Sequence, residues 1–173
     1  MKTITTVAFL LATSCFAQDT PKAPPANPKD VESMDSIIQA VYDVISGPAG
    51  KRDFDRMRSL FVAKPLLGSA VRTRSGDIRY VGGDLEWYIK GSGPYFEKNG
   101  FFEREIHRHA DNYGNITQLF STYESRNNKD DKKPFERGIN SFQLMNDGKR
   151  WWIVSIYWQG EDPKAPIPRA WLR

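Results

Sequence analysis

The two histidines of the chain stand close together in a stretch rich in charge. His107, His109 and Asp111 occupy alternate positions. Alternate residues of a β-strand project from one face, so we expect these side chains to form a row that Glu103 and Glu105 extend. In a pocket wall, a histidine of this row could act as a general base or bind a metal, with the aspartate orienting it. The alternative is the solvated outer face of an edge strand, where charge discourages pairing with another chain.

A second polar candidate is Asn140, which lies among apolar residues. A buried amide without a hydrogen-bond partner costs about 1–3 kcal/mol, so Asn140 must meet either a backbone carbonyl or a ligand. Trp158 stands near the end of the next apolar run and is expected beside it. The sequence therefore offers two sets of pocket candidates, one around the histidines and one around Asn140.

A long β-hairpin over residues 136–159 must position the second set. Asn146, Asp147 and Gly148 separate two runs of β-forming residues, and the glycine suits the left-handed position of a three-residue loop. With this loop, even-numbered residues of both strands share one face. We expect that largely apolar face to hold Asn140, Phe142, Leu144, Trp152, Val154, Ile156 and Trp158.

The other strands and the helices follow from periodicity. Apolar residues at helical spacing predict a long helix that starts at Asn27–Pro28 or Asp30 and ends at Gly47–Pro48. We expect shorter helices over 53–61 and 84–89, short strands within 70–81, and long strands over 101–113 and 116–126. Helices followed by four long antiparallel strands indicate an α+β fold, with the helices on one face of a curved sheet.

The amino terminus, residues 1–17, has the pattern of a secretory signal peptide. Lys2 precedes an apolar run and small residues, and we expect cleavage after Ala17. The apolar run is too short for a stable membrane span. Cys15, the only cysteine, is an alternative lipidation site; a chain cleaved after Ala17 would hold no disulfide. The predicted location is secreted or periplasmic.

The remainder divides into three parts. Residues 18–30, rich in Pro and Ala, are expected to form a linker, residues 31–161 one domain, and residues 162–173 a Pro-rich arm. The net charge of +4 is dispersed along the chain, so a nucleic-acid partner is not expected.

Several segments together resemble a known superfamily. The early helices, the short helix at 84–89, the strand GNITQLFSTYE and the terminal DGKRWWIVSIYW are similar to the SnoaL-like, nuclear transport factor two-like superfamily, which includes ketosteroid isomerase. The resemblance implies a cone, in which a bent antiparallel sheet wraps the long helix and leaves a pocket at its open end. Members include isomerases, dehydratases, cyclases and proteins without a known activity.

The resemblance does not assign catalytic roles. Isomerases of that superfamily use an aspartate base with a tyrosine and a protonated aspartic acid as oxyanion donors. Asp111, Tyr123 and Tyr157 are of suitable types, but no motif maps these roles onto them, and we assign none. Tyr123 joins the pocket candidates, which are His107, His109, Tyr123, Asn140 and Trp158.

Three functions remain open on the sequence alone. The first is an exported domain that binds a small apolar ligand in the cone pocket. The second is an enzyme of the isomerase, dehydratase or cyclase type acting on a small carbonyl compound. The third is a non-catalytic module that forms a homodimer through the mixed outer face of the sheet. No cofactor and no metal is expected, and the sequence does not decide which sheet face lines the pocket.

Overall fold

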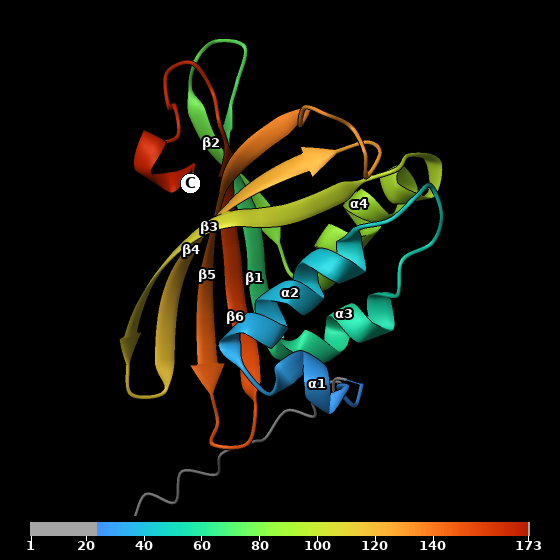
Figure 1. The fold of residues 1–173 in the computed structure, drawn as a ribbon, viewed down its shortest axis with the longest axis vertical. Helices are drawn as coiled ribbons and strands as arrows, with labels where there is room; N and C mark the ends of the chain where they lie inside the picture. Colours follow the sequence, from blue (N-terminus) through green and yellow to red (C-terminus); the bar gives the residue numbers. More distant parts are fainter. Residues whose placement is uncertain (1–23, 173) are drawn as a thin grey trace, which may run out of the picture.

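Four helices cover one face of a six-stranded sheet (Figure 1). The structure is a computed structural model that describes residues 24–172, so the predicted signal peptide and most of the predicted linker lie outside the described residues. The helices are α1 (Pro28–Val31), α2 (Met34–Ile45), α3 (Phe54–Leu60) and α4 (Leu85–Lys98), and η1 (Arg169–Trp171) is a 3-10 turn. The strands are β1 (Phe61–Arg72), β2 (Ile78–Gly83), β3 (Phe102–Tyr113), β4 (Ile116–Arg126), β5 (Glu136–Asn146) and β6 (Trp151–Gly160).

The sheet has the order β2-β1-β6-β5-β4-β3, and it bends around α2. Every pair of neighbouring strands is antiparallel except β1 and β6, which run parallel. The predicted α+β class, with helices on one face of a curved and mostly antiparallel sheet, is therefore confirmed. None of the helices in residues 24–172 is long and apolar enough to cross a bilayer.

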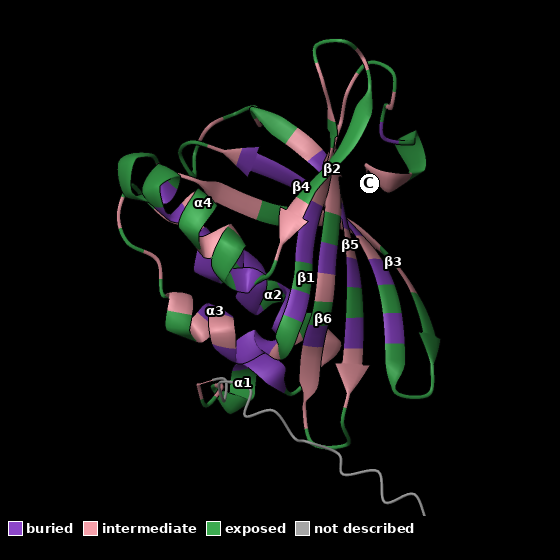
Figure 2. Ribbon diagram, turned by 180° about the vertical axis from the view of Figure 1, so that it is seen from behind, coloured by how far each residue is buried: buried purple, intermediate pink, exposed green. Residues whose placement is uncertain are grey.

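The core lies between α2 and the concave face of the sheet, where Figure 2 shows buried residues concentrated. Ser33 caps α2 by accepting a hydrogen bond from the backbone N–H of Ser36 at 3.0 Å. The apolar stripe of the helix is buried as its spacing predicts: Ile37, Ile38, Val41, Val44 and Ile45. Each such side chain contributes about 1.5–3 kcal/mol on burial.

Two helix boundaries differ from the prediction. Asn27 caps the separate short helix α1, and the long helix begins only after Ser33. Helix α4 does not end at Ile89 but continues to Lys98 with Pro94 inside it. Leu85 and Phe96 are buried at its two ends, so packing of both ends on the core outweighs the local cost of the glycines and the proline.

Strand β1 begins at Phe61, earlier than the sequence indicates. The pairing register with β6 shifts between Phe61 and Leu66, and Pro65 lies inside that irregular stretch. A bulge is one of the few places where a strand accepts proline. Phe61 and Leu67 on either side of it are both buried, so tertiary packing, not local alternation, extends the strand.

The hairpin of β5 and β6 forms, with a different loop. The reversal spans residues 147–150 and is closed by a 3.2 Å hydrogen bond from the N–H of Asp147 to the carbonyl of Arg150. Gly148 has a φ of 88°, the left-handed conformation expected of it. The predicted three-residue loop at Asn146–Gly148 is therefore wrong in length, because the loop spans residues 147–150, although the chain turns where the sequence predicts.

A bulge then divides the hairpin's predicted apolar face. Phe142 pairs with Ile156 as expected, but the register shifts beyond Gln143, and Leu144 pairs with Ile153. Ile153 is fully buried, whereas Val154 is 38% exposed. Trp152 and Val154 thus leave the expected face, because one extra residue reverses the alternation along β6.

The arm from Glu161 onward lies against the convex face. Ile167 is buried, and the ring of Trp171 lies 5.7 Å from that of Phe120. Arg72 and Asp162 form an ion pair at 3.2 Å that fastens the start of the arm.

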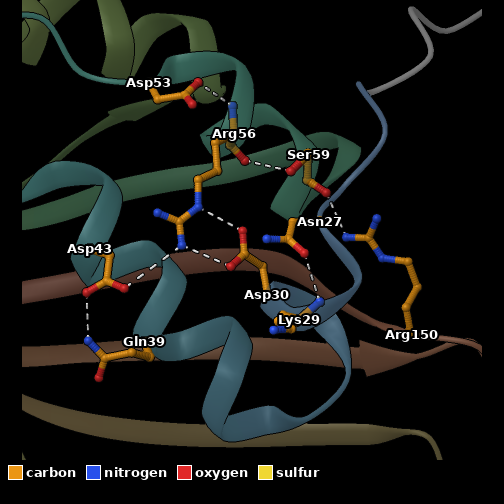
Figure 3. Close-up of polar contacts among 9 residues, drawn as sticks. All are labelled: Asn27, Lys29, Asp30, Gln39, Asp43, Asp53, Arg56, Ser59 and Arg150. Atoms are coloured by element: carbon orange, nitrogen blue, oxygen red, sulfur yellow. Dashed lines mark hydrogen bonds and ion pairs between the residues drawn. The ribbon is translucent and has the colours of Figure 1, made fainter.

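Ion pairs also join the amino-terminal helices (Figure 3). Arg56 of α3 donates to both carboxylate oxygens of Asp30, at 2.7 and 2.9 Å, and so holds α1 against α3. Asp30 is buried, and this bidentate arginine supplies both its counter-charge and its hydrogen bonds.

The carboxyl end of α2 is tied to the start of β3. Gly47 and Phe101 exchange backbone hydrogen bonds at 2.7 and 3.0 Å. Ser46 Oγ accepts from the N–H of Glu103 at 2.9 Å and donates to its carbonyl at 3.1 Å. Arg52 holds the connecting loop by donating to four backbone carbonyls, those of Ile45, Gly47, Pro48 and Gly50.

We predict that Arg52→Met lowers the free energy of unfolding by about 2 kcal/mol, because the loop carbonyls lose charge-assisted hydrogen bonds. Arg52→Lys should recover only part of the loss, since an ammonium group cannot reproduce the planar fork. Urea unfolding followed by tryptophan fluorescence measures both. The control is Lys51→Met at the exposed neighbouring position, which should stay within about 0.5 kcal/mol. Equal effects at the two positions would show that the loop does not depend on Arg52.

Candidate functional site

A cavity of about 150 Å³ lies inside the cone. Its apolar walls come from α2, α3 and four of the strands with their flanks, and include Val41, Ile45, Met57, Leu67, Phe101, Phe142, Ile156 and Trp158. Its polar groups are Tyr88, Glu103, Tyr123, Glu136 and Asn140. An engineered apolar cavity of about 150 Å³ holds benzene, so the space suits a ligand with one ring.

A bulge in β3 brings Glu103 to this cavity. Glu105 pairs with Tyr123 but His107 pairs with Thr122, so Ile106 is an extra residue in the strand. The bulge reverses the alternation. Glu103 and Glu105 therefore share the concave face with Tyr123, while the residues beyond Ile106 change sides. The expected single row from Glu103 to Asp111 is wrong for this reason.

The structure divides the five pocket candidates. Tyr123, Asn140 and Trp158 line the cavity together. His107 and His109 are not among its lining residues; His109 lies 3.4 Å from Asp111, with both side chains largely exposed. The sequence reasoning missed Glu103 as a cavity residue separate from the histidines, and it missed Tyr88 and Glu136. Nothing in the alternation of β3 marks the bulge that separates Glu103 from the histidines.

Gly138 permits the arrangement at the open end of the cavity. It stands opposite Tyr123 in the pairing of β4 and β5. A Cβ at this position would lie 2.4 Å from the Tyr123 hydroxyl oxygen, so only glycine leaves room for that side chain. The hydroxyl reaches Glu136 Oε1 at 3.3 Å, and Glu136 itself is exposed, which places it at the rim.

Hydrogen-bond donors surround the carboxyl group of Glu103. Ser125 Oγ donates to Oε2 at 2.7 Å, and Asn140 Nδ2 lies 3.5 Å from Oε1. The same amide nitrogen donates to the Tyr42 hydroxyl at 3.1 Å. These contacts, with the Ser46 bonds to its backbone, give Glu103 a defined position.

Burial dominates the electrostatics of the site. It raises the pKa of Glu103 from 4.5 to about 7, while the bonds from Ser125 and Asn140 lower that pKa and the charge of Glu136 raises it further. Burial also raises the pKa of Tyr42, Tyr88 and Tyr123 above the usual range, so these phenols remain protonated. Among the described residues that line the cavity there is no Lys, Arg or His.

The arrangement can exchange a proton near neutral pH. A carboxyl group with a pKa near 7 is matched to general acid or base work. The hydroxyl groups of Tyr88 and Tyr123 can hydrogen-bond the polar end of a bound molecule. In the part of the chain that the structure describes, no group of three or more His, Cys, Asp or Glu side chains could hold a metal ion.

A second hollow, of about 320 Å³, lies on the outer face beneath the carboxyl-terminal arm. Its walls include Phe120, Ile139 and Ile167. Glu161 is its carboxylate, and it already binds Arg137 at 2.7 Å and the N–H of Ile167 at 3.0 Å. Because the Glu161 carboxylate already has these protein partners, it is not available to a ligand, and we place the candidate site in the inner cavity.

The burial of Glu103 predicts a dependence of stability on pH. Below its unfolded-state pKa of about 4.5 the carboxyl is protonated in both states, and its burial carries no ionisation penalty. As pH rises to about 7, the unfolded state ionises first, so the free energy of unfolding should fall by about 3 kcal/mol and then level off. Glu103→Gln should remove this part of the pH dependence and be more stable than the parent protein at about pH 8.

Urea unfolding at several pH values measures this difference, and the readout is the parent-minus-variant curve, because other groups titrate as well. The control is Glu97→Gln, an exposed residue of α4, which should keep the parent's pH dependence. A parent-minus-variant curve for Glu103→Gln that is flat from about pH 4 to about pH 8 would contradict the raised pKa.

Comparisons with known proteins bear on the fold. No protein-family model and no curated protein matches the sequence significantly. Among solved structures, a proposed dehydratase of the NTF2-like family from Streptomyces avermitilis superposes with a TM-score of 0.53 at 10% identity, over 75% of this chain and 94% of that one. A proposed ketosteroid isomerase from Parabacteroides distasonis gives 0.51 at 15% identity, over 83% and 99% of the two chains.

A third similar structure is a proposed calcium/calmodulin-dependent protein kinase type II association domain from Thiobacillus denitrificans. Its TM-score is 0.53 at 10% identity, and the match covers 82% of this chain and 99% of that one. At these identities the likeness concerns the fold alone. The chain therefore has the cone fold of the NTF2-like, ketosteroid isomerase-like proteins, as the resemblance in its sequence predicts.

Proposed function

We propose that this protein binds a small, largely apolar ligand with a single ring in the inner cavity, and that the polar end of the ligand lies at Glu103. The observation that carries this proposal is an apolar cavity with a half-buried, desolvated carboxyl group at its polar end. The signal-like amino terminus supports a place of action outside the cytoplasm, either secreted or periplasmic.

The energetic cost of the site supports a role in binding. The side chains leave a space of about 150 Å³, and filling such a volume with apolar groups stabilises a core by about 24 cal/mol per Å³, or roughly 4 kcal/mol of folding free energy here. The buried Glu103 adds a second cost at neutral pH. A leucine at position 103 and larger wall residues would remove both costs. A ligand that fills the space and interacts with Glu103 would offset both costs.

We predict that Ile156→Phe abolishes binding of single-ring fragments by filling the cavity that Ile156 lines. The matched control is Val154→Phe, the same kind of enlargement two residues away on the exposed bulge of β6, which should bind as the parent does. Ligand-observed NMR with a fragment set, and native mass spectrometry of protein purified from its source, measure binding. If Ile156→Phe and Val154→Phe bind alike, the ligand is elsewhere.

A second candidate function is proton transfer on a small carbonyl compound, of the isomerase or dehydratase type. The specific observation that favours it is the pKa of about 7 at Glu103, beside the protonated hydroxyls of Tyr88 and Tyr123. Two of the similar structures carry names of this type, a proposed dehydratase and a proposed ketosteroid isomerase.

Deuterium exchange tests this second function. The parent protein should catalyse incorporation of deuterium next to the carbonyl of cyclohexanone in D₂O, with a rate that rises with pH and levels off above about pH 7. Glu103→Gln should reduce the rate by about 100-fold or more, while Glu97→Gln should leave it unchanged. Exchange no faster than in buffer alone would leave ligand binding as the function.

A further inference from the structure

Glu103 differs from several other buried or half-buried carboxylates of the structure, because they have a cation beside them. Asp30 is paired with Arg56, Glu105 with Arg108, and Glu124 with both Arg104 and Arg126. Glu103 lies in the same fold, but its side chain hydrogen-bonds Ser125 and Asn140, neither of which is charged. Each of these three carboxylates has at least one arginine beside it, so the lack of a cation among the described residues that line the cavity is a distinct feature of Glu103.

The hydrogen bonds around Glu103 have a fixed direction. Ser121 donates its single proton to Glu105, so the Tyr42 hydroxyl, 2.7 Å from Ser121 Oγ, must donate to Ser121. The Tyr42 oxygen is then free to accept, and it accepts from Asn140 Nδ2. The amide of Asn140 is thereby turned so that its NH₂ group, which can only donate, faces Glu103.

The direction of these hydrogen bonds determines which protonation state of Glu103 they stabilise. Donors stabilise a carboxylate, whereas a protonated carboxyl group needs an acceptor for its own proton. Asn140 Nδ2 cannot accept, so the Oε1 side of Glu103 suits the ionised form, whereas the Ser125 hydroxyl at Oε2 can serve either charge state. Asn140 therefore favours an ionised Glu103, which has no cation among the described residues that line the cavity.

The walls of the cavity favour a cation with an apolar body. Five aromatic side chains line it, those of Tyr88, Phe101, Tyr123, Phe142 and Trp158. Tyr88 and Trp158 meet edge to face with their centroids 6.1 Å apart. The faces of aromatic rings attract ammonium groups, most strongly where water is excluded. Glu136 at the exposed rim adds negative charge on the way in.

We propose that the ligand of the inner cavity is a small single-ring amine, held as its ammonium ion by the carboxylate of Glu103 and the surrounding aromatic rings. This inference rests on the proposed function, since it names the chemical class of the molecule that the cavity binds. The ammonium group supplies the missing counter-ion and donates to Glu103, and the ring of the ligand fills the apolar space of about 150 Å³.

Binding of such a cation is coupled to a proton. Because burial raises the pKa of Glu103 to about 7, the carboxyl group is protonated at lower pH when no cation is bound, and an ammonium ion must displace that proton. The affinity for the amine should therefore rise about tenfold per pH unit up to about pH 7 and then stay constant until the amine itself loses its proton.

The experiment compares benzylamine with benzyl alcohol, which has nearly the same size and shape without the charge. Calorimetric titrations between about pH 5 and about pH 8 should give an affinity for benzylamine that rises about 100-fold, and an affinity for benzyl alcohol that does not rise. At about pH 6, titrations in buffers of different ionisation enthalpy should detect release of a proton on benzylamine binding. This second readout needs only the parent protein.

Glu103→Gln should lower benzylamine affinity at about pH 8 by about 100-fold and leave benzyl alcohol binding in place, while Glu97→Gln should bind both as the parent does. Benzyl alcohol binding without benzylamine binding, or benzylamine binding that ignores pH or survives Glu103→Gln, would overturn the amine proposal and leave the binding function standing. Failure of both probes to bind would overturn the single-ring binding function itself.

Discussion

Glu103 places a carboxyl group in a largely apolar cavity whose described lining residues include no cation. The rest of the structure depends on how that group is held. Glu103 is held there by its backbone bonds to Ser46, by Ser125, and by the bulge at Ile106 that turns it inward. Each of these contacts belongs to a different element, so the position of the group depends on the closure of the whole cone. The site is consequently a product of the tertiary fold and not of a local motif.

The cone itself follows from ordinary packing. Helix α2 presents a buried stripe to a bent sheet, and Gly47, with the carbonyls that Arg52 binds, joins the end of that helix to β3. The fold is shared with proteins that carry very different names, from a dehydratase to a kinase association domain. A fold used so widely does not specify a function, so the function must be argued from the charge, size and hydrogen bonding of the cavity.

Periodicity predicts what is regular in this chain. The buried stripe of α2, the long strands β3 and β4 and the turn at Gly148 all follow from spacing and turn residues, and so does the α+β class. The structure departs from the prediction where a β-bulge interrupts the two-residue alternation of a strand. Val154 follows Ile153, and both are apolar, so nothing in the sequence shows which of them faces the core.

The same limit explains the error at the site. Nothing in the sequence around Ile106 signals an extra residue. In a strand without one, the histidines would continue the row of glutamates. The bulge becomes visible once β3 is paired with β4, because Tyr123 and Thr122 then face opposite sides. Asn140, in contrast, was predictable as a pocket candidate, since a lone amide on an apolar face must find a partner.

The most direct test of the site is the titration of Glu103 itself. Carbon-13 NMR of the glutamate side-chain carboxyl groups, with the Glu103 signal assigned by its loss in Glu103→Gln, measures its pKa in the folded protein. We expect a midpoint near 7. A midpoint in the ordinary range of glutamic acid, about 4 to 5, would show that the group is solvated, and it would remove the basis for both the proton exchange and the amine site.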